Sequence, residues 1–338
     1  MATWGELLAK IKSLQTQGRK DAFDIVRREA LADLASYTGR NVILYASAHL
    51  QKPSIPPEGL SITNEDIEGF MEVVYGLSGS KLDLIIHSPG GRAEATEAIV
   101  KYLRSVFKDI RIIVPHEAMS AATMLACAGD KILMGLHSYL GPIDPQFRLS
   151  TSLGPQSVPA QAILDQFERA KQECTQDRAN LAVWVPSLQQ YGPALLQQCE
   201  NALNLSKTLV EEWLSRWMFR KSKKRKEYSK QVSDTLANHK ELLTHGRPLN
   251  ISFLKSMHMK VYALEDDIKL QDKVLTVYHA TMHTFGATPA AKIFENQNGR
   301  AYIKQFRAVV VPQPQQMRAP TQPRQPRPTT PPEQAQPN

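Results

Sequence analysis

Two short turns rich in small residues constrain the fold of this chain more than any other feature. The first, Ser-Pro-Gly-Gly at residues 88–91, directly follows the apolar run 82–87, and the second, Ala-Met-Ser-Ala-Ala at residues 118–122, comes soon after the apolar run 110–115. Apolar positions at helical spacing follow each turn. A strand, a tight turn and a helix, repeated in this order, is typical of parallel sheets with right-handed crossovers. We therefore predict an α/β fold.

The rest of the chain extends this pattern. We predict buried strands at residues 41–47, 82–87, 110–115 and 131–134, and helices at residues 63–77, 93–107 and 120–128. Loops are expected where proline, serine and glycine gather, at residues 48–60, 138–160 and 244–248. A long helical stretch at 161–237, broken near Pro186 and at Gly192-Pro193, leads to a short helix at 251–257, a strand at 260–264 and a mixture of helix and strand at 269–308.

These elements predict a division of the chain into five segments. They are amphipathic helices at 1–40, a core region at 41–160, a helical insert at 161–240, a return of the core at 241–311 and a tail at 312–338. The tail carries nine prolines with Gln and Thr between them. Such a segment cannot bury enough apolar surface to offset its ordering entropy, so we expect it to be disordered.

Charge and cysteine content bound the setting of the protein. The formal net charge is +8, and residues 220–226 alone carry six positive charges in seven residues. Three widely spaced cysteines fit reduced thiols rather than a disulfide framework. The first residues lack the basic and apolar regions of a signal peptide, and no stretch is long and apolar enough to span a membrane. We therefore expect a cytoplasmic protein.

The basic run at 220–226 has two interpretations. It contains no aromatic residue that could stack on bases, which argues against a specific nucleic-acid partner. Trp213 and Trp217 lie just upstream, four residues apart and so on one helix face. This layout fits a solvated helix between subunits or over the site, or a helix whose basic end makes a weak contact with a membrane surface.

Ser120, in the second turn, is a candidate nucleophile. Small flanking residues allow a tight turn with an accessible hydroxyl, and the N-terminus of the following helix would stabilise a developing negative charge. A serine in this place can equally serve as an ordinary helix N-cap.

The Gly-Gly pair of the first turn is a candidate oxyanion site. Gly90 and Gly91 follow a strand at the edge of the sheet where ligands of parallel sheets bind. Their backbone N–H groups could receive a carbonyl oxygen, although a plain turn that requires positive φ would also select glycine.

A nucleophilic serine needs a base and a group that orients this base. His87 and His116 stand at strand ends close to the two turns and fit structural roles better. Asp144, in a Gly-Pro-Ile-Asp-Pro loop, and His245, in a Thr-His-Gly-Arg-Pro loop, are the remaining candidates. By themselves they could equally be a capping aspartate and a surface histidine.

Four segments together resemble the serine dehydrogenase proteinase family, a distant relative of Clp-type peptidase subunits and of signal peptide peptidase A. They are His-Ser-Pro-Gly-Gly-Arg-Ala-Glu at 87–94, the stretch from Pro115 to Ile132, Leu-Gly-Pro-Ile-Asp-Pro-Gln at 140–146, and Thr-His-Gly-Arg-Pro-Leu at 244–249. The resemblance covers residues 40–265. It implies a crotonase-like fold of stacked βα units, here with a helical insert.

The resemblance also implies a serine peptidase that acts on peptides or proteins. In this family the catalytic residues occur in the order Ser, Asp, His, which is the order of Ser120, Asp144 and His245. Ser120 would attack, His245 would carry the proton, Asp144 would hold the histidine, and N–H groups among Gly90, Gly91 and Ala121 would bind the oxyanion.

Three alternatives stay open at this point. Signal peptide peptidase A relatives use a Ser–Lys dyad, and Lys171 lies at the corresponding distance after the serine. The chain could also be an inactive oligomeric scaffold, or an acyl-CoA enzyme of the same broad fold.

Cofactors and partners follow from the same comparison. No dinucleotide fingerprint and no metal-ligand spacing is present, so we expect neither a cofactor nor a metal. The ring-forming relatives imply a homo-oligomer. No docking motif for a regulatory ATPase is apparent.

Overall fold

A central sheet organises the computed structural model, which describes residues 3–151 and 154–306. The sheet has seven strands in the order β11-β10-β1-β2-β3-β5-β9. Their bounds are β1 (Asn41–Ser47), β2 (Lys81–His87), β3 (Asp109–Val114), β5 (Lys131–Met134), β9 (Val261–Ala263), β10 (Ala290–Asn296) and β11 (Ala301–Gln305). The strands β1, β2, β3, β5 and β9 are parallel, which confirms the parallel α/β sheet predicted for residues 41–134.

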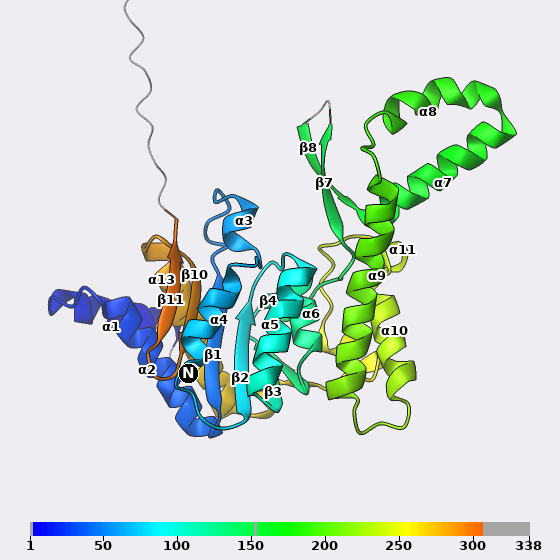
Figure 1. The fold of residues 1–338 in the computed structure, drawn as a ribbon. Helices are drawn as coiled ribbons and strands as arrows, with labels where there is room; N and C mark the ends of the chain where they lie inside the picture. Colours follow the sequence, from blue (N-terminus) through cyan, green and yellow to red (C-terminus); the bar gives the residue numbers. More distant parts are fainter. Residues whose placement is uncertain (1–2, 152–153, 307–338) are drawn as a thin grey trace, which may run out of the picture. The chain divides into compact units, whose positions relative to one another are not determined.

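Helices cover both faces of this sheet, because its strands bury side chains on both sides (Figure 1). On β2, Leu84 and Ile86 belong to one apolar core and Ile85 to the other. The first core is covered by α4 (Asp66–Val74), α5 (Ala93–Val106), α6 (Ala121–Cys127), α9 (Leu195–Trp213), α10 (Arg225–Ala237) and α12 (Ile251–Ser256). The second is covered by α2 (Ala22–Thr38), α3 (Pro57–Leu60) and α13 (Ile268–Ala287), while α1 (Trp4–Thr16) packs on α2 and α13.

The predicted loop at 138–160 is wrong in part. It contains β6 (Tyr139–Leu140), which pairs with β4 (Glu117–Ala118), and a two-stranded ribbon of β7 (Gln146–Thr151) and β8 (Gly154–Pro159). The many serine, proline and glycine residues of this segment are typical of a loop. The ribbon forms nevertheless, because a few apolar side chains stabilise it. Phe147, Leu149 and Val158 pack against a small core shared with α7 and α9. The predicted loop at 48–60 likewise contains the short α3.

The insert is helical as predicted, but its breaks differ. It consists of α7 (Ala160–Gln176), η1 (Arg178–Asn180), α8 (Leu181–Leu188), α9, η2 (Leu214–Met218), α10 and α11 (His239–Leu242). The chain turns at Gly192-Pro193 as expected. Pro186, in contrast, lies inside α8, and the other breaks fall at η1 and at 219–224. Figure 1 shows α7 and α8 extending away from the sheet, and α8 leaves Leu181, Val183 and Val185 exposed.

The C-terminal part of the sheet departs from the parallel pattern. β10 pairs with β1 and β11 with β10, both antiparallel, so the sheet is mixed. The predicted tail at 312–338 lies outside the described residues.

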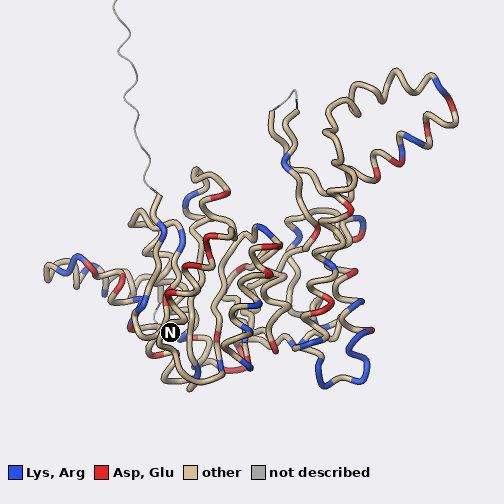
Figure 2. Tube along the Cα trace, in the orientation of Figure 1, with Lys and Arg blue, Asp and Glu red and all other residues tan. Residues whose placement is uncertain are grey.

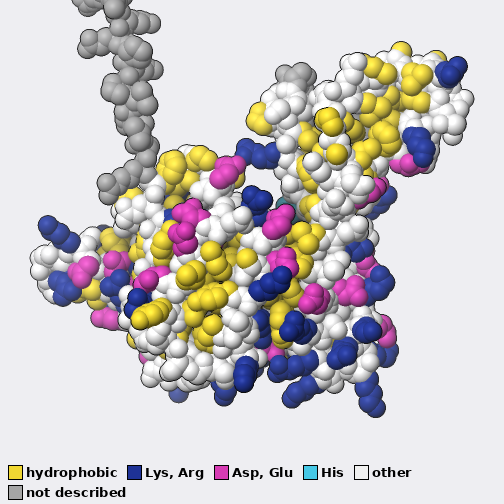
Figure 3. All heavy atoms as spheres, in the orientation of Figure 1, with side chains coloured by type: hydrophobic (Ala, Val, Ile, Leu, Met, Phe, Trp, Pro, Cys, Tyr) yellow, Lys and Arg dark blue, Asp and Glu magenta, His cyan; other side chains and the backbone are white. Residues whose placement is uncertain are grey.

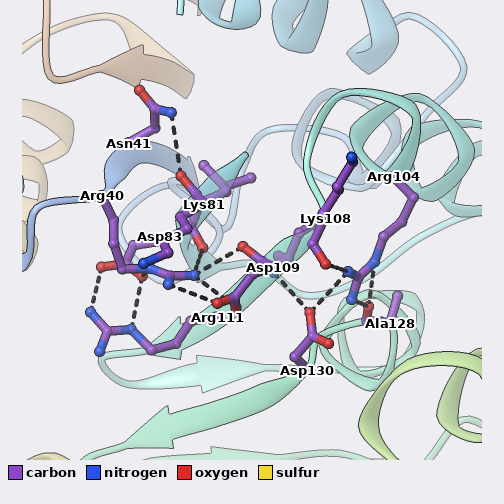
Figure 4. A network of polar contacts seen from close by, with 12 residues as sticks. Arg40, Asn41, Lys81, Asp83, Arg104, Lys108, Asp109, Arg111, Ala128 and Asp130 are labelled. Carbon is purple, nitrogen blue, oxygen red and sulfur yellow. Dashed lines mark hydrogen bonds and ion pairs between the residues drawn. The ribbon is translucent and has the colours of Figure 1, made fainter. Parts of the chain in front are cut away.

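The amino ends of the parallel strands are held by buried ion pairs. Asp83 on β2 accepts hydrogen bonds from Arg40 Nε at 2.6 Å and from Arg111 Nε at 2.8 Å, and Arg40 also reaches Asp109 (Figure 4). Arg104 forms a second group with Asp130 at 2.9 Å. The two turns follow the parallel strands β2 and β3 and therefore lie at the opposite, carboxyl edge of the sheet.

A buried lysine joins the sheet to α4. The Lys292 ammonium lies 2.9 and 3.0 Å from the two carboxylate oxygens of Asp66, and neither side chain is exposed. Removing one partner of a buried pair leaves an uncompensated charge, which costs about 3–5 kcal/mol. We expect Lys292→Met to lower the free energy of unfolding by about that amount in denaturant titrations. Lys304→Met, which breaks the partly exposed pair with Glu65, should change it by less than about 1 kcal/mol. Equal effects of the two variants would contradict this expectation.

The basic run at 220–226 begins in the connection between η2 and α10 and ends in the first two residues of α10, where Figure 2 shows clustered Lys and Arg. Figure 3 shows the same side chains at the surface at this end of α9 and α10. Trp213 is buried, and Trp217 lies under the guanidinium of Arg104, 4.4 Å from its ring centre. The two tryptophans therefore face the core. Among the described residues, no helix is long and apolar enough to cross a membrane.

Candidate active site

Ser120 occupies a strained turn directly before α6. Its φ of 51° and ψ of −121° lie in a region that non-glycine residues rarely adopt. Its side chain makes no capping hydrogen bond with the helix, so the N-cap interpretation finds no support. Backbone strain of this kind persists only where the surroundings enforce it, and it is typical of functional sites. The turn thus holds the Ser120 hydroxyl at the N-terminus of α6, although this hydroxyl does not cap the helix.

The two turns predicted from the sequence meet in space. The Met119 N–H donates to the Ser88 carbonyl at 3.0 Å, and the Ser88 N–H donates to the Glu117 carbonyl at 3.3 Å. A Cβ atom added to Gly90 would lie 2.7 Å from Cβ of Ser120 and 2.8 Å from the backbone nitrogen of Ala121. Only glycine allows this approach, which puts the Gly-Gly turn directly beside the serine.

This close approach makes Gly90 a sensitive position. Gly90 has φ +91°, and its added Cβ would also lie 2.4 Å from the Met119 carbonyl oxygen. Gly79, with φ +85°, has no atom within 4 Å of its added Cβ and is a matched control. We expect Gly90→Ala to destabilise the fold by about 2 kcal/mol or more beyond Gly79→Ala, since the latter costs only backbone strain of about 1–2 kcal/mol. Denaturant unfolding of both variants measures the difference, and equal losses would contradict it.

The three predicted oxyanion donors differ in their availability. The Gly90 N–H donates to Oγ of Ser88 at 3.2 Å, so it is already engaged. Gly91 is bridged to Ile62 through the groups on either side of it, the Gly90 carbonyl and the Arg92 N–H. Among the described residues, the N–H groups of Gly91 and Ala121 have no hydrogen-bond acceptor. These two N–H groups are the available donors.

Asp144 and His245 lie together, although 101 residues separate them. Oδ1 of Asp144 accepts a hydrogen bond from Nδ1 of His245 at 2.7 Å. Asp144 is only 1% exposed, whereas the side chain of His245 is 27% exposed. An ionised carboxylate can only accept, so this bond requires the ring tautomer with the proton on Nδ1, which leaves Nε2 available to act as a base.

Ser120 and His245 share one open cleft of about 640 Å³. Gly91 and Ala121 line it as well, and its apolar wall includes Met124. The candidate nucleophile, the candidate base and the available donors therefore all line one cleft, which could receive a peptide.

Lys171, the alternative base, is not part of this cleft. It lies on α7 with its side chain 66% exposed, and its ammonium is 3.6 Å from Glu168. Its neighbours Arg169, Glu173 and Glu168 also form ion pairs on α7, so Lys171 belongs to a solvated helix face.

His87 and His116 belong to a buried cluster behind the turns. The ring centre of His87 lies 4.6 Å from that of His49 and 5.7 Å from that of His116, and neither of its nitrogens has a hydrogen-bond partner among the described residues. Glu117 bonds His49 and Tyr139, and these bonds outweigh burial and hold the pKa of Glu117 at about 2. The cluster packs under the turn that carries Ser120.

Burial, reinforced by the neighbouring His49, holds the pKa of His87 at about 3, below its ordinary 6.5. Between pH 6.5 and pH 3, His87 is therefore protonated in the unfolded chain but not in the folded protein. The free energy of unfolding falls as the pH drops through this range. At 1.36 kcal/mol per unit, this group costs about 3 kcal/mol between pH 7 and pH 4. Unfolding titrations at the two pH values should show His87→Leu losing that much less stability than wild type. The exposed His258, replaced by Asn, should leave the loss unchanged.

Two further contacts of Asp144 were not predicted from the sequence. Oδ2 of Asp144 accepts from Nδ1 of His239 at 3.1 Å and from Nε2 of Gln146 at 2.9 Å. Gln146 stands two residues after Asp144, whereas His239 is the first residue of the four-residue helix α11, 95 residues away in the sequence. The spacing between His239 and His245 matches no known motif, so the sequence alone could not identify His239. Among the described residues, no group of three His, Cys, Asp or Glu side chains is arranged to hold a metal ion.

Fold and site together define a class, the Clp peptidase-like, crotonase-like α/β proteins with a serine beside a Gly-Gly turn. The comparisons agree with this class. Residues 61–285, more than half of the chain, match the family described as ClpP-like SDH-type serine proteinase. The chain belongs to this family.

Two curated relatives come from Methanocaldococcus jannaschii. The chain is 30% identical to uncharacterized protein MJ0137 over 217 residues, 64% of each protein. It is also 30% identical to uncharacterized protein MJ1495 over 201 residues, 59% of each. The chain thus spans less than two thirds of the length of either relative. Among solved structures, a mutant of the 1510-N membrane-bound stomatin-specific protease matches at 17% identity with a TM-score of 0.36, over 63% of this chain and 79% of the other.

Proposed function

We propose that this member of a serine proteinase family hydrolyses peptide bonds through an acyl-enzyme formed on Ser120. The observation that carries the proposal is the 2.7 Å bond between Asp144 and His245, with His245 and Ser120 lining one cleft. A buried carboxylate that orients a partly exposed histidine, in a cleft that also holds a strained serine, offers the groups of a catalytic triad.

The proposed reaction has two halves. Oγ of Ser120 attacks the carbonyl carbon of the peptide, and its proton passes to Nε2 of His245. The N–H groups of Gly91 and Ala121 stabilise the oxyanion. The C–N bond then breaks, and His245 returns the proton to the leaving amine. A water molecule then gives a proton to His245 and attacks the ester carbon. The bond between this carbon and Oγ of Ser120 breaks, and His245 returns the proton to Oγ, which releases the carboxylic acid and free Ser120.

Activity-based labelling tests the proposal directly. A fluorophosphonate probe should modify wild-type protein, and peptide mapping should locate the adduct on Ser120. Ser157 also lines the cleft, so Ser157→Ala is the matched control and should label normally. Absence of labelling in well-folded protein would favour an inactive scaffold, and labelling that survives His245→Ala unchanged would point to another base such as Lys171.

Assembly and setting remain predictions of the same proposal. We expect self-association, which sedimentation velocity would detect, a cytoplasmic location, and a weak contact of residues 220–226 with anionic membrane surfaces. The exposed position of most residues of the basic run supports the last of these.

A further inference from the structure

We infer that His239 is a positioning residue that acts on the catalytic site through Asp144. The inference rests on the proposed function and extends it by a fourth side chain. The evidence is the contact of Nδ1 of His239 with Oδ2 of Asp144 at 3.1 Å, on the opposite side of the carboxylate from His245.

Asp144 needs such a partner because it is almost fully buried. A buried carboxylate is stable only when its oxygens are bonded, and each oxygen offers two lone pairs. His245 uses Oδ1, while His239 and Gln146 both donate to Oδ2. The donors on Oδ2 fix the rotation of the carboxylate group, so that Oδ1 stays aimed at His245.

His239 cannot replace His245 as the base. It does not line the cleft that holds Ser120, and its side chain is 21% exposed. Its influence on the reaction therefore passes through the carboxylate. The bond from His239 draws negative charge away from Oδ1, which makes His245 less basic than it would be beside an Asp144 bonded on one side only.

The other charged groups near His239 are occupied elsewhere. Lys240, the next residue of α11, pairs with Asp165 of α7 at 3.0 Å. Glu241 bonds Asn238 at 3.2 Å, and Asp234 of α10 pairs with Lys207 and Lys230. Within the described part of the chain, Asp144 is thus the charged group that His239 contacts.

Three variants of the full chain test the inference. His239→Ala removes the donor, His239→Asn keeps a side-chain N–H at a similar distance from the backbone, and Lys240→Ala perturbs the same helix without touching Asp144. We expect His239→Ala to lower kcat for a fluorogenic peptide about tenfold with little change in KM. The acid limb of its pH profile should move upward by on the order of half a unit, because His245 becomes more basic. His239→Asn should recover most of the activity, and Lys240→Ala should resemble wild type.

A measurement that needs no turnover separates this inference from the proposed function. Histidine-labelled protein allows the His245 ring to be titrated by NMR in wild type and variants. A higher pKa of His245 in His239→Ala, reversed in His239→Asn, supports the inference even in a chain that cleaves no peptide. An unchanged His245 titration and an unchanged kcat would overturn it while leaving the peptidase proposal intact.

Discussion

Replacing Ser120 with alanine should abolish peptide hydrolysis, with a fall in kcat/KM on the order of 10⁴-fold or more. The proposed acyl-enzyme forms on Oγ of Ser120, and alanine removes this atom with little change in size. The turn should survive, since its φ of 51° is imposed by the backbone bonds around it and the hydroxyl makes no capping bond. Removing the oxygen therefore tests chemistry rather than folding.

Initial rates on a fluorogenic peptide library, together with probe labelling, measure this loss. The control is Ser157→Ala, which removes a hydroxyl from another part of the same cleft and should retain wild-type rates. Denaturant midpoints of the two variants should agree with wild type within the error of the titration. Peptide cleavage at the native rate by a folded Ser120→Ala protein would falsify the assignment of the nucleophile.

The fold was predictable where local chemistry and periodicity agree. Residues 41–134 alternate apolar runs with helical spacing, and the structure has parallel strands there with helices between them. The Ser-Pro-Gly-Gly turn and Ser120 were found because tight turns demand small residues at particular positions. Gly90 illustrates this, since its Cβ would overlap the turn that carries Ser120.

What failed depends on tertiary contacts that no local pattern encodes. The β7–β8 ribbon reads as loop because its stability comes from Phe147, Leu149 and Val158 packing on the insert. The antiparallel pairing of β10 with β1 could not be predicted, because the sequence of one strand does not indicate which edge of the sheet it joins or in which direction. The contact of His239 with Asp144 spans 95 residues and depends on a four-residue helix.

The site lies between these two cases. Asp144 and His245 could be nominated as candidates, but their pairing follows from how the loop after β6 meets the loop after α11. An antiparallel backbone bridge between Leu140 and Leu249 joins the two loops, four residues before Asp144 and four residues after His245. Residues 140–144 and 245–249 therefore come together as parts of one structural unit, and the contact between Asp144 and His245 is a consequence of this pairing.

Asp144→Asn should reduce kcat by about 10³–10⁴-fold while leaving KM nearly unchanged. An ionised Asp144 accepts from both His245 and His239, but an amide can present its oxygen to only one of them. If its NH₂ group faces His245, the ring must carry its proton on Nε2, where it cannot accept one from Ser120. Asp165→Asn is the control, since Asp165 pairs with Lys240 outside the cleft. This substitution should leave kcat unchanged.

The pH dependence of the residual rate distinguishes a lost tautomer from a lost fold. A partly unfolded variant would show a reduced rate with the wild-type pH profile, because only the concentration of active protein has changed. A variant with the wrong tautomer keeps its full folded fraction, and its remaining activity should rise with hydroxide concentration, which can replace the base. Lys171 pairs with Glu168 on the exposed face of α7, and Asp144 is not part of this pair. A mechanism with Lys171 as the base therefore predicts no effect of Asp144→Asn on kcat, and that result would reject the triad.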